Sequence, residues 1–320
     1  MRAALRLLLL LISCAPVCSW AQTIGTLDPK PLPPLANPND PKLPAKELFG
    51  RASMPTTTTP HVFGFYAKGC LAGAEALPIT GADWQVMRLS RNRNWGYPTL
   101  IKVIERIAAL GKKAGWPGLL IGDMSQPRGG PMLTGHASHQ IGLDADIWLT
   151  PMPDHVLSRA EREEMSAVNM VADSRTDVNP KVWTSKQTAI LKIAAKQPEV
   201  ERIFVNAAIK KQLCREAGSD RAWLAKLRPW WGHDFHFHMR LHCPNGEASC
   251  KGQDAPPAGD GCGKELAWWF SDAVLHPKPS PKPEKPAPPV RLADLPAACR
   301  QVLQAPQVQT AQQKQVPPAQ

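Results

Sequence analysis

The stretch WWGHDFHFHMRLHC, residues 230–243, decides how this chain folds. Phe235 and Phe237 alternate with His236 and His238, which is the period of two that a β-strand produces. In a strand, the apolar side chains face the core and the two imidazoles lie side by side on the opposite face. Two imidazoles separated by one residue can converge on one metal ion or one reacting atom. The stretch therefore predicts both a strand and a chemical site.

A second stretch, GHASHQIGLDADIW at residues 135–148, has the same alternation. Asp144 and Asp146 are predicted to share one face of a strand, because the apolar residues between and around them face the core. His139 comes from a glycine-containing turn, seven residues before Asp146. The two stretches together supply imidazoles and carboxylates from two elements.

His139, Asp146 and His238 form a His/Asp/His set that leaves a fourth tetrahedral position for water, as catalytic zinc sites do. His236 would stand beside that water as a general base. Either motif alone is more often structural, but the two on amphipathic strands favour a metal site. Ser138 offers a serine hydrolase as an alternative, which we disfavour because the glycine pattern of a nucleophile elbow is absent from the sequence.

The remaining periodicities predict an α+β fold, in which helices flank a small, mostly antiparallel sheet. Capping residues and apolar spacing predict helices at residues 98–114, 184–198 and 206–218. Strands are predicted at residues 118–121, 142–149, 203–205 and 234–241. The sequence contains no glycine-rich phosphate loop opening a helix, which argues against a doubly wound parallel sheet.

Proline marks the borders of the folded part. The chain has 320 residues, of which 34 are proline and 43% are hydrophobic. That proline share is about twice the usual ~5%. Prolines gather in residues 22–60, predicted to be a linker, and in residues 277–320, predicted to be a Pro/Lys/Gln-rich tail. The foldable body is therefore residues 61–276, a length that suits one large domain.

Residues 1–21 have the features of a secretory signal peptide, with Arg2 and Arg6 before an apolar run at residues 7–12 and a small-x-small cleavage site. A lipobox at Cys14 is a less favoured alternative that would attach a lipid. The apolar run is too short to span a bilayer, so we expect no transmembrane segment. The net charge of +11 and the absence of a nucleic-acid motif favour an anionic envelope polymer as partner rather than nucleic acid.

Six cysteines remain after the signal segment, and an even number in an exported chain predicts disulfides that staple the fold. Six cysteines allow 15 pairings, of which Cys243 with Cys250 is the most local. Trp230 and Trp231 are candidates for stacking on substrate or for packing the rim of the site, and Trp268 and Trp269 are expected in the core. Three arginines are candidates for binding substrate carboxylates or else surface charges: Arg128, Arg228 and Arg240.

The sequence resembles a known family, the penicillin-insensitive murein endopeptidases. The two histidine stretches, together with GCLAGAEALP, RIFVNAAIKKQLC and GDGCGKEL, occur in the family's order and spacing over roughly residues 64–275. The resemblance implies a metallopeptidase domain of the lysostaphin and D-Ala-D-Ala peptidase type, whose small antiparallel sheet holds an H-x6-D…H-x-H zinc site.

The resemblance also implies roles for individual residues. His139, Asp146 and His238 correspond to zinc ligands, His236 to the base or transition-state stabiliser, and His233 to a further active-site histidine. The implied substrate is crosslinked peptidoglycan, cut at the D-alanyl–meso-diaminopimelyl bond in the periplasm. The implied disulfides are Cys70–Cys299, Cys214–Cys262 and Cys243–Cys250.

One stretch departs from the family pattern. Some members have an aspartate and a histidine before the tryptophan that matches Trp183, as extra ligands beside the residue matching His136. Here ADSRTDVNPKVW offers Asp173 and Asp177 but no histidine, so His136 and Asp177 are candidate ligands and one zinc ion is expected. The alternatives are a related zinc D,D-carboxypeptidase or amidase and a non-catalytic peptidoglycan-binding protein.

Overall fold

The computed structural model describes residues 25–278 and 287–307. The predicted signal peptide, part of the proline-rich tail and the last residues lie outside these ranges. Among the residues described, no helix combines the length and apolar character needed to cross a bilayer. The fold is α+β, as the sequence predicts.

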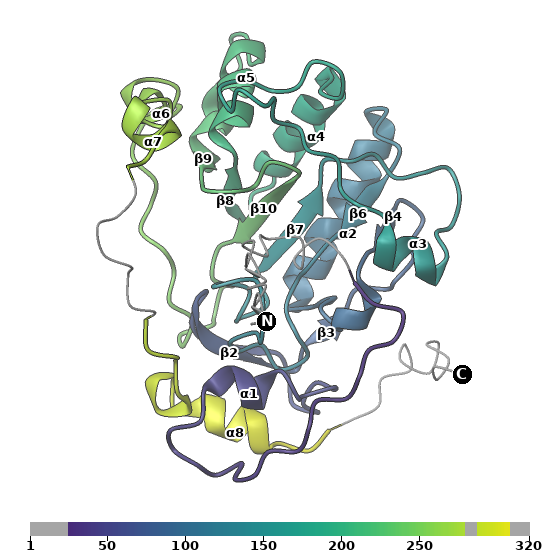
Figure 1. Cartoon of the computed structure of the whole chain (residues 1–320), viewed down its shortest axis with the longest axis vertical. Coiled ribbons are helices and arrows are strands. Elements are labelled where there is room, and N and C mark those ends of the chain that lie inside the picture. Colours follow the sequence, from purple (N-terminus) through teal and green to yellow (C-terminus); the bar gives the residue numbers. More distant parts are fainter. Residues whose placement is uncertain (1–24, 279–286, 308–320) are drawn as a thin grey trace, which may run out of the picture.

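A six-stranded mixed sheet forms the centre of the molecule, in the order β4-β6-β7-β10-β8-β9 (Figure 1). The three inner pairs, β6 with β7, β7 with β10 and β10 with β8, are antiparallel, and the two outer pairs are parallel. The strands are β4 (Trp84–Val86), β6 (Leu119–Ile121), β7 (Asp144–Trp148), β8 (Val200–Val205), β9 (Leu227–Pro229) and β10 (His236–Leu241).

Three longer helices pack beside this sheet: α2 (Pro98–Lys113), α4 (Ser185–Ala195) and α5 (Ala207–Glu216). The starts of α4 and α5 follow the predicted caps. Thr184 and Gln187 form a capping box on α4, and the Asn206 side chain accepts the Ala208 N–H on α5 at 2.9 Å. Helices α2 and α4 approach closely at Gly111, where an added Cβ would lie 2.7 Å from a methyl group of Ile190.

The register between β7 and β10 positions the chemistry. His238 lies opposite Asp146, and Arg240 lies opposite Asp144, in this antiparallel pair. The alternate residues on both strands, Ala145 among them, join the core that the helices cover. The two predicted strands are therefore confirmed, and their polar side chains share the face away from α2 and α4.

The segments that carry α1 and α8, near the two ends of the described chain, meet at the end of the molecule away from α5 (Figure 1). Helix α1 (Ala45–Phe49) and helix α8 (Ala298–Gln304) pack with the hairpin of β1 (His61–Phe65) and β2 (Lys68–Ala72) around one apolar cluster. Part of each proline-rich segment thus folds onto the body. The remaining short elements are β3 (Glu75–Ala76), η2 (Leu89–Arg91), β5 (Trp95–Gly96), α3 (Arg159–Glu164), η3 (Ala222–Lys226), α6 (Lys264–Trp268), α7 (Asp272–Leu275) and η4 (Leu292–Asp294).

Three disulfides are present, and their pairing is the one that the family resemblance implies. They join Cys70 to Cys299, Cys214 to Cys262 and Cys243 to Cys250. The first spans 229 residues of sequence and ties α8 to β2. The second ties the segment before α6 to α5.

Candidate metal centre

Asp146 is the centre of a compact cluster of imidazoles. Its Oδ1 atom lies 3.2 Å from Nδ1 of His238, 3.4 Å from Nε2 of His139 and 3.6 Å from Nε2 of His236. Its Oδ2 atom lies 3.4 Å from Nδ1 of His136. One carboxylate therefore faces four histidines that come from β10 and from the loop before β7.

The loop that carries His139 has an unusual backbone. His139 is fully buried and has a φ of 67°, in the left-handed region that few residues other than glycine adopt. Its N–H donates to Oδ2 of Asp144 at 3.0 Å, which holds this conformation. Gly142 takes a similar φ of 69°, and the chain then enters β7. The turn thus aims the imidazole of His139 at Asp146.

Asp144 forms a second layer behind these histidines. It is fully buried, and Arg240 donates to both of its oxygens, from Nε at 2.8 Å and from Nη2 at 3.1 Å. Oδ1 of Asp144 also lies 3.2 Å from Nε2 of His238. Burial alone would raise the pKa of Asp144, but the Arg240 guanidinium holds it well below its usual range. The Arg240 guanidinium stacks 4.0 Å from the ring centre of Tyr66.

A further carboxylate, Asp123, holds His136 and was not predicted from the sequence. Its Oδ2 atom lies 2.9 Å from Nε2 of His136, 3.0 Å from Arg91 and 2.8 Å from Arg93. Asp123 follows β6, and its carbonyl accepts the N–H of Asp146 at 2.9 Å. It reaches the site only through the pairing of β6 with β7, so no local pattern in the sequence marks it.

The histidines differ in the proton affinity that their surroundings give them. Burial lowers the pKa of His139 to about 4 and also lowers that of His236. For His238, burial acts in the same direction, but the carboxylates of Asp144 and Asp146 outweigh it and raise the pKa to about 9. Metal ions bind the neutral form of an imidazole.

Several buried atoms of the cluster have no hydrogen-bond partner within the part of the chain that the structure describes. They are both ring nitrogens of His139, Oδ1 of Asp146, Nδ1 of His236 and Nε2 of His238. Unpaired buried polar atoms are costly, so a bound group is expected to satisfy them. Ligand atoms of His136, His139 and Asp146 all lie within 4.8 Å of one another. The donor set of imidazoles and a carboxylate fits a transition metal such as zinc.

Comparison with known proteins agrees with this geometry. The sequence model of the family described as penicillin-insensitive murein endopeptidase matches residues 62–304. The chain belongs to this family. Members are metallopeptidases, and His136, His139 and Asp146 form a group that is able to hold a metal ion. The family resemblance of the two histidine stretches is thereby confirmed.

Individual relatives named penicillin-insensitive murein endopeptidase are similar over most of their length. The Haemophilus influenzae protein is 46% identical over 252 residues, covering 76% of this chain and 82% of the relative. A Yersinia pestis protein is 45% identical over 249 residues, covering 78% and 87%. A Klebsiella pneumoniae protein is 43% identical over 254 residues, covering 79% and 89%.

The structure brings together most, but not all, of the residues that the sequence predicts for the site. His136, His139, Asp146, His236 and His238 all meet there, as described above. His233 lies at its edge, with its ring centre 4.9 Å from that of His236 and Nδ1 2.8 Å from the carbonyl oxygen of Trp231.

Asp177 lies outside this cluster. Its carboxylate accepts hydrogen bonds from Arg215 at 2.9 Å and from Lys211 at 3.4 Å. These bonds hold the pKa of Asp177 low, at about 2. Its interactions within the described residues are with these cations and the neighbouring backbone, so the structure does not place it as a ligand. Asp173 is exposed on the same loop and lines a separate pocket.

Several expectations for arginines and tryptophans are wrong. Arg128 is 1% exposed and donates to three carbonyls at the end of α8, so it is neither a surface charge nor a substrate ligand. Arg240 is likewise buried, as the partner of Asp144. Trp268 is 55% exposed instead of lying in the core. Arg228 pairs with Glu265 at 2.7 Å.

Proposed function

We propose that this protein is a zinc-dependent murein endopeptidase that hydrolyses D-alanyl–meso-diaminopimelyl crosslinks of peptidoglycan in the periplasm. Relatives up to 46% identical carry the name penicillin-insensitive murein endopeptidase, which supports murein as the substrate. The observation that carries the proposal is the set of buried, unpaired ligand atoms around Asp146. Export through the N-terminal signal segment would deliver the enzyme to this polymer.

His139, Asp146 and His238 would hold the ion. Zinc, when bound, supplies a Lewis acid that polarises the scissile carbonyl and lowers the pKa of water toward ~7. Two further carboxylates orient the histidines: Asp144 contacts both His139 and His238, and Asp123 contacts His136. One ion is assigned to the site, because Asp177 is engaged by Arg215 and Lys211.

His236 and His233 would accept protons or hydrogen bonds during the reaction. His236 lies beside Asp146 with its Nδ1 unpaired, and burial keeps its imidazole neutral, so it can accept a proton from the attacking water. The Nδ1 of His233 faces the Trp231 carbonyl, so this nitrogen carries the proton and leaves Nε2 as an acceptor. His233 is then suited to orient the substrate or to stabilise the transition state.

This chemistry forms no covalent acyl-enzyme. β-Lactams act by trapping a serine nucleophile, so penicillin should leave the activity unchanged. The bond preference separates the enzyme from related zinc carboxypeptidases and amidases. A carboxypeptidase would release free D-alanine, and an amidase would separate the peptide from the sugar.

The test is digestion of purified crosslinked muropeptide dimers by the mature protein. We expect conversion to monomers, loss of activity on chelation, recovery with zinc and no effect of penicillin. His238→Ala should lose activity and metal, whereas Asp177→Asn, at the excluded candidate ligand, should keep both. End-group analysis should find a new diaminopimelate amine and no free D-alanine. Intact dimers at full zinc occupancy would refute the endopeptidase.

A further inference from the structure

An exposed group of indole rings lies beside the metal centre. Trp230, Trp231 and Trp268 are 53%, 52% and 55% exposed, and Trp269 is half-buried between them. The ring centre of Trp231 is 4.8 Å from that of Trp269 and 6.5 Å from that of Trp268. Exposed aromatic clusters on a soluble protein commonly mark a binding surface, because their exposure is unfavourable without a partner.

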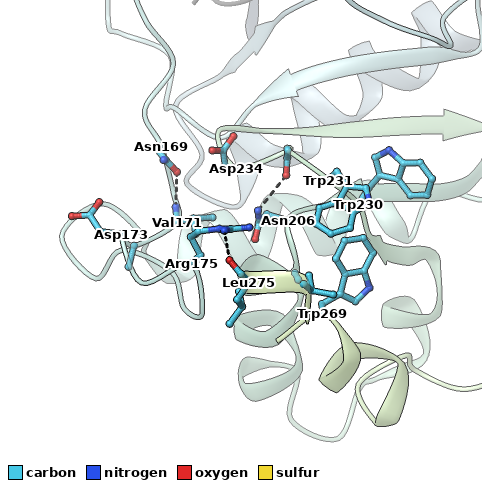
Figure 2. A pocket seen from close by; sticks show the side chains of 14 residues that line it. Asn169, Val171, Asp173, Arg175, Asn206, Trp230, Trp231, Asp234, Trp269 and Leu275 are labelled. Carbon is cyan, nitrogen blue, oxygen red and sulfur yellow. Dashed lines mark hydrogen bonds between the residues drawn. The ribbon is translucent and has the colours of Figure 1, made fainter. Parts of the chain in front are cut away.

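Three of these residues, Trp230, Trp231 and Trp269, line a pocket of about 300 Å³ (Figure 2). In Figure 2, Asn169 and Asp234 lie on the side of the pocket away from the indole of Trp269, and Asn206 lies between them and the indoles. The Asn206 amide donates to the carbonyl of Gly232 at 3.3 Å. The pocket thus offers flat aromatic faces on one side and amides with a carboxylate on the other.

The wall that carries Trp268 and Trp269 is fixed to the body of the protein. The Cys214–Cys262 disulfide holds the segment before α6 against α5. Buried Lys210 donates to the carbonyl of Asp260 at 2.6 Å. On the other side of the pocket, Arg175 donates to the carbonyl of Leu275 at the end of α7, at 2.9 Å. Short helices with little core of their own are therefore held in place, which keeps the two indoles oriented.

The pocket lies next to the metal centre. Gly232 and Asp234, which line it, are the two neighbours of His233 in the chain. Phe204 links the two regions, since its ring centre lies 5.7 Å from that of Trp230 and 5.3 Å from that of His238. A polymer whose scissile bond lies at the metal centre would extend over the indoles.

We propose that this pocket binds an N-acetylated sugar of the glycan strand to which the crosslinked peptide is attached. The inference rests on the proposed function and adds a glycan subsite to it. The apolar face of a sugar ring matches the exposed indoles, and its hydroxyl and acetamido groups match the amides of Asn169 and Asn206. A diaminopimelate carboxylate fits less well, because it would meet the carboxylates of Asp173 and Asp234, while Arg175, the cation in the lining, donates to the Leu275 carbonyl.

The test compares two substrates. Crosslinked muropeptide dimers are prepared with their disaccharides and, after amidase treatment, without them. For Trp269→Ala we expect kcat/KM on the disaccharide dimer to fall about tenfold, mainly through KM, as for loss of one aromatic anchor. Cleavage of the sugar-free dimer should change less than about twofold. Trp269→Tyr, which keeps a ring, should recover most of the loss.

Direct binding supplies a second measurement that does not depend on catalysis. Peptide-free glycan strands are titrated against the wild type, Trp231→Ala, Trp269→Ala and the control Leu110→Ala, which removes an exposed apolar side chain on α2. Only the tryptophan variants should lose affinity. Equal effects on both dimers, or glycan affinity unchanged by Trp269→Ala, would overturn the subsite. Tryptophan-dependent glycan binding without cleavage of either dimer would support the subsite and refute the endopeptidase.

Discussion

Replacing Asp144 by asparagine tests whether the second layer of the site acts on the metal or only on the fold. The native carboxylate receives two hydrogen bonds from Arg240, accepts the N–H of His139 and contacts Nε2 of His238. Breaking a buried ion pair costs about 3–5 kcal/mol, because the remaining charge is left without a partner. Asparagine keeps one acceptor oxygen, so we expect the free energy of unfolding to fall by roughly 2–4 kcal/mol.

The same substitution should weaken metal binding. Groups that orient a metal-ligating histidine typically contribute 10–100-fold to metal affinity, and Asp144 contacts His139 and His238, the two histidines proposed as ligands. We therefore expect a loss of zinc affinity of about 100-fold. Stability is measured by denaturant unfolding in the presence of a chelator, so that metal binding does not contribute. Affinity is measured by competition with a chromogenic chelator.

A double variant separates the two effects. Asp144→Asn combined with Arg240→Met removes the unpaired guanidinium, so at least half of the lost stability should return. Zinc affinity should stay low, because the carboxylate beside His238 is still missing. If the double variant regains both properties, Asp144 is only a structural partner of Arg240. A single variant with wild-type stability and affinity would refute the reasoning altogether.

Three further predictions concern groups outside this layer. Arg128→Met should lower the free energy of unfolding by about 3 kcal/mol, since it leaves carbonyls at the end of α8 without a donor, whereas Arg300→Met, at an exposed position on α8, should change thermal unfolding little. Asp177→Asn should leave zinc affinity unchanged in the same competition assay, and a tenfold loss would restore Asp177 as a ligand. Buried Lys210 has its pKa lowered to about 7, chiefly by burial, against ~10.5 unfolded. Between these two pKa values the unfolded state binds one more proton than the folded state. The free energy of unfolding of the wild type, relative to that of Lys210→Met, should therefore rise with pH above 7, by at most ~1.4 kcal/mol per pH unit. A difference that does not change in denaturant titrations from pH 7 to 9 would contradict this.

Local signals allowed the sequence to predict the elements that carry the site. The alternation around His236 and His238 defines β10, and the capping box at Thr184 starts α4, because each depends on residues within one turn or one strand. The structure pairs His238 with Asp146, and a slip of β10 by one residue would turn its imidazoles toward the apolar core and Phe237 toward the site.

Contacts between residues far apart in the sequence were not predictable in this way. Asp123 reaches His136 across the sheet, and Arg128 reaches α8 over 174 residues or more. Both look like ordinary surface charges in the sequence, because nothing local distinguishes a buried guanidinium from an exposed one. The prediction for Trp268 is wrong in the opposite sense. An apolar residue near a cysteine suggests the core, but too few residues pack around its short helix to cover the side chain.

The partners of the three buried carboxylates, Asp123, Asp144 and Asp146, explain why they are suited to different roles. Asp123 and Asp144 each pair with arginine, which balances their charge inside the protein. The ion-pair contacts of Asp146 are all with imidazoles, and its Oδ1 atom has no hydrogen bond within the described residues. A carboxylate already balanced by a guanidinium attracts a divalent cation weakly, so Asp146 is the one suited to be a ligand. The other two are suited to orient histidines, Asp123 through Nε2 of His136 and Asp144 through His238 and the backbone of His139. Alternation on β7 therefore places the proposed ligand Asp146 and the orienting group Asp144 two residues apart on one face. Arg240 on β10 pairs with Asp144, which leaves Asp146 as the carboxylate suited to bind a metal.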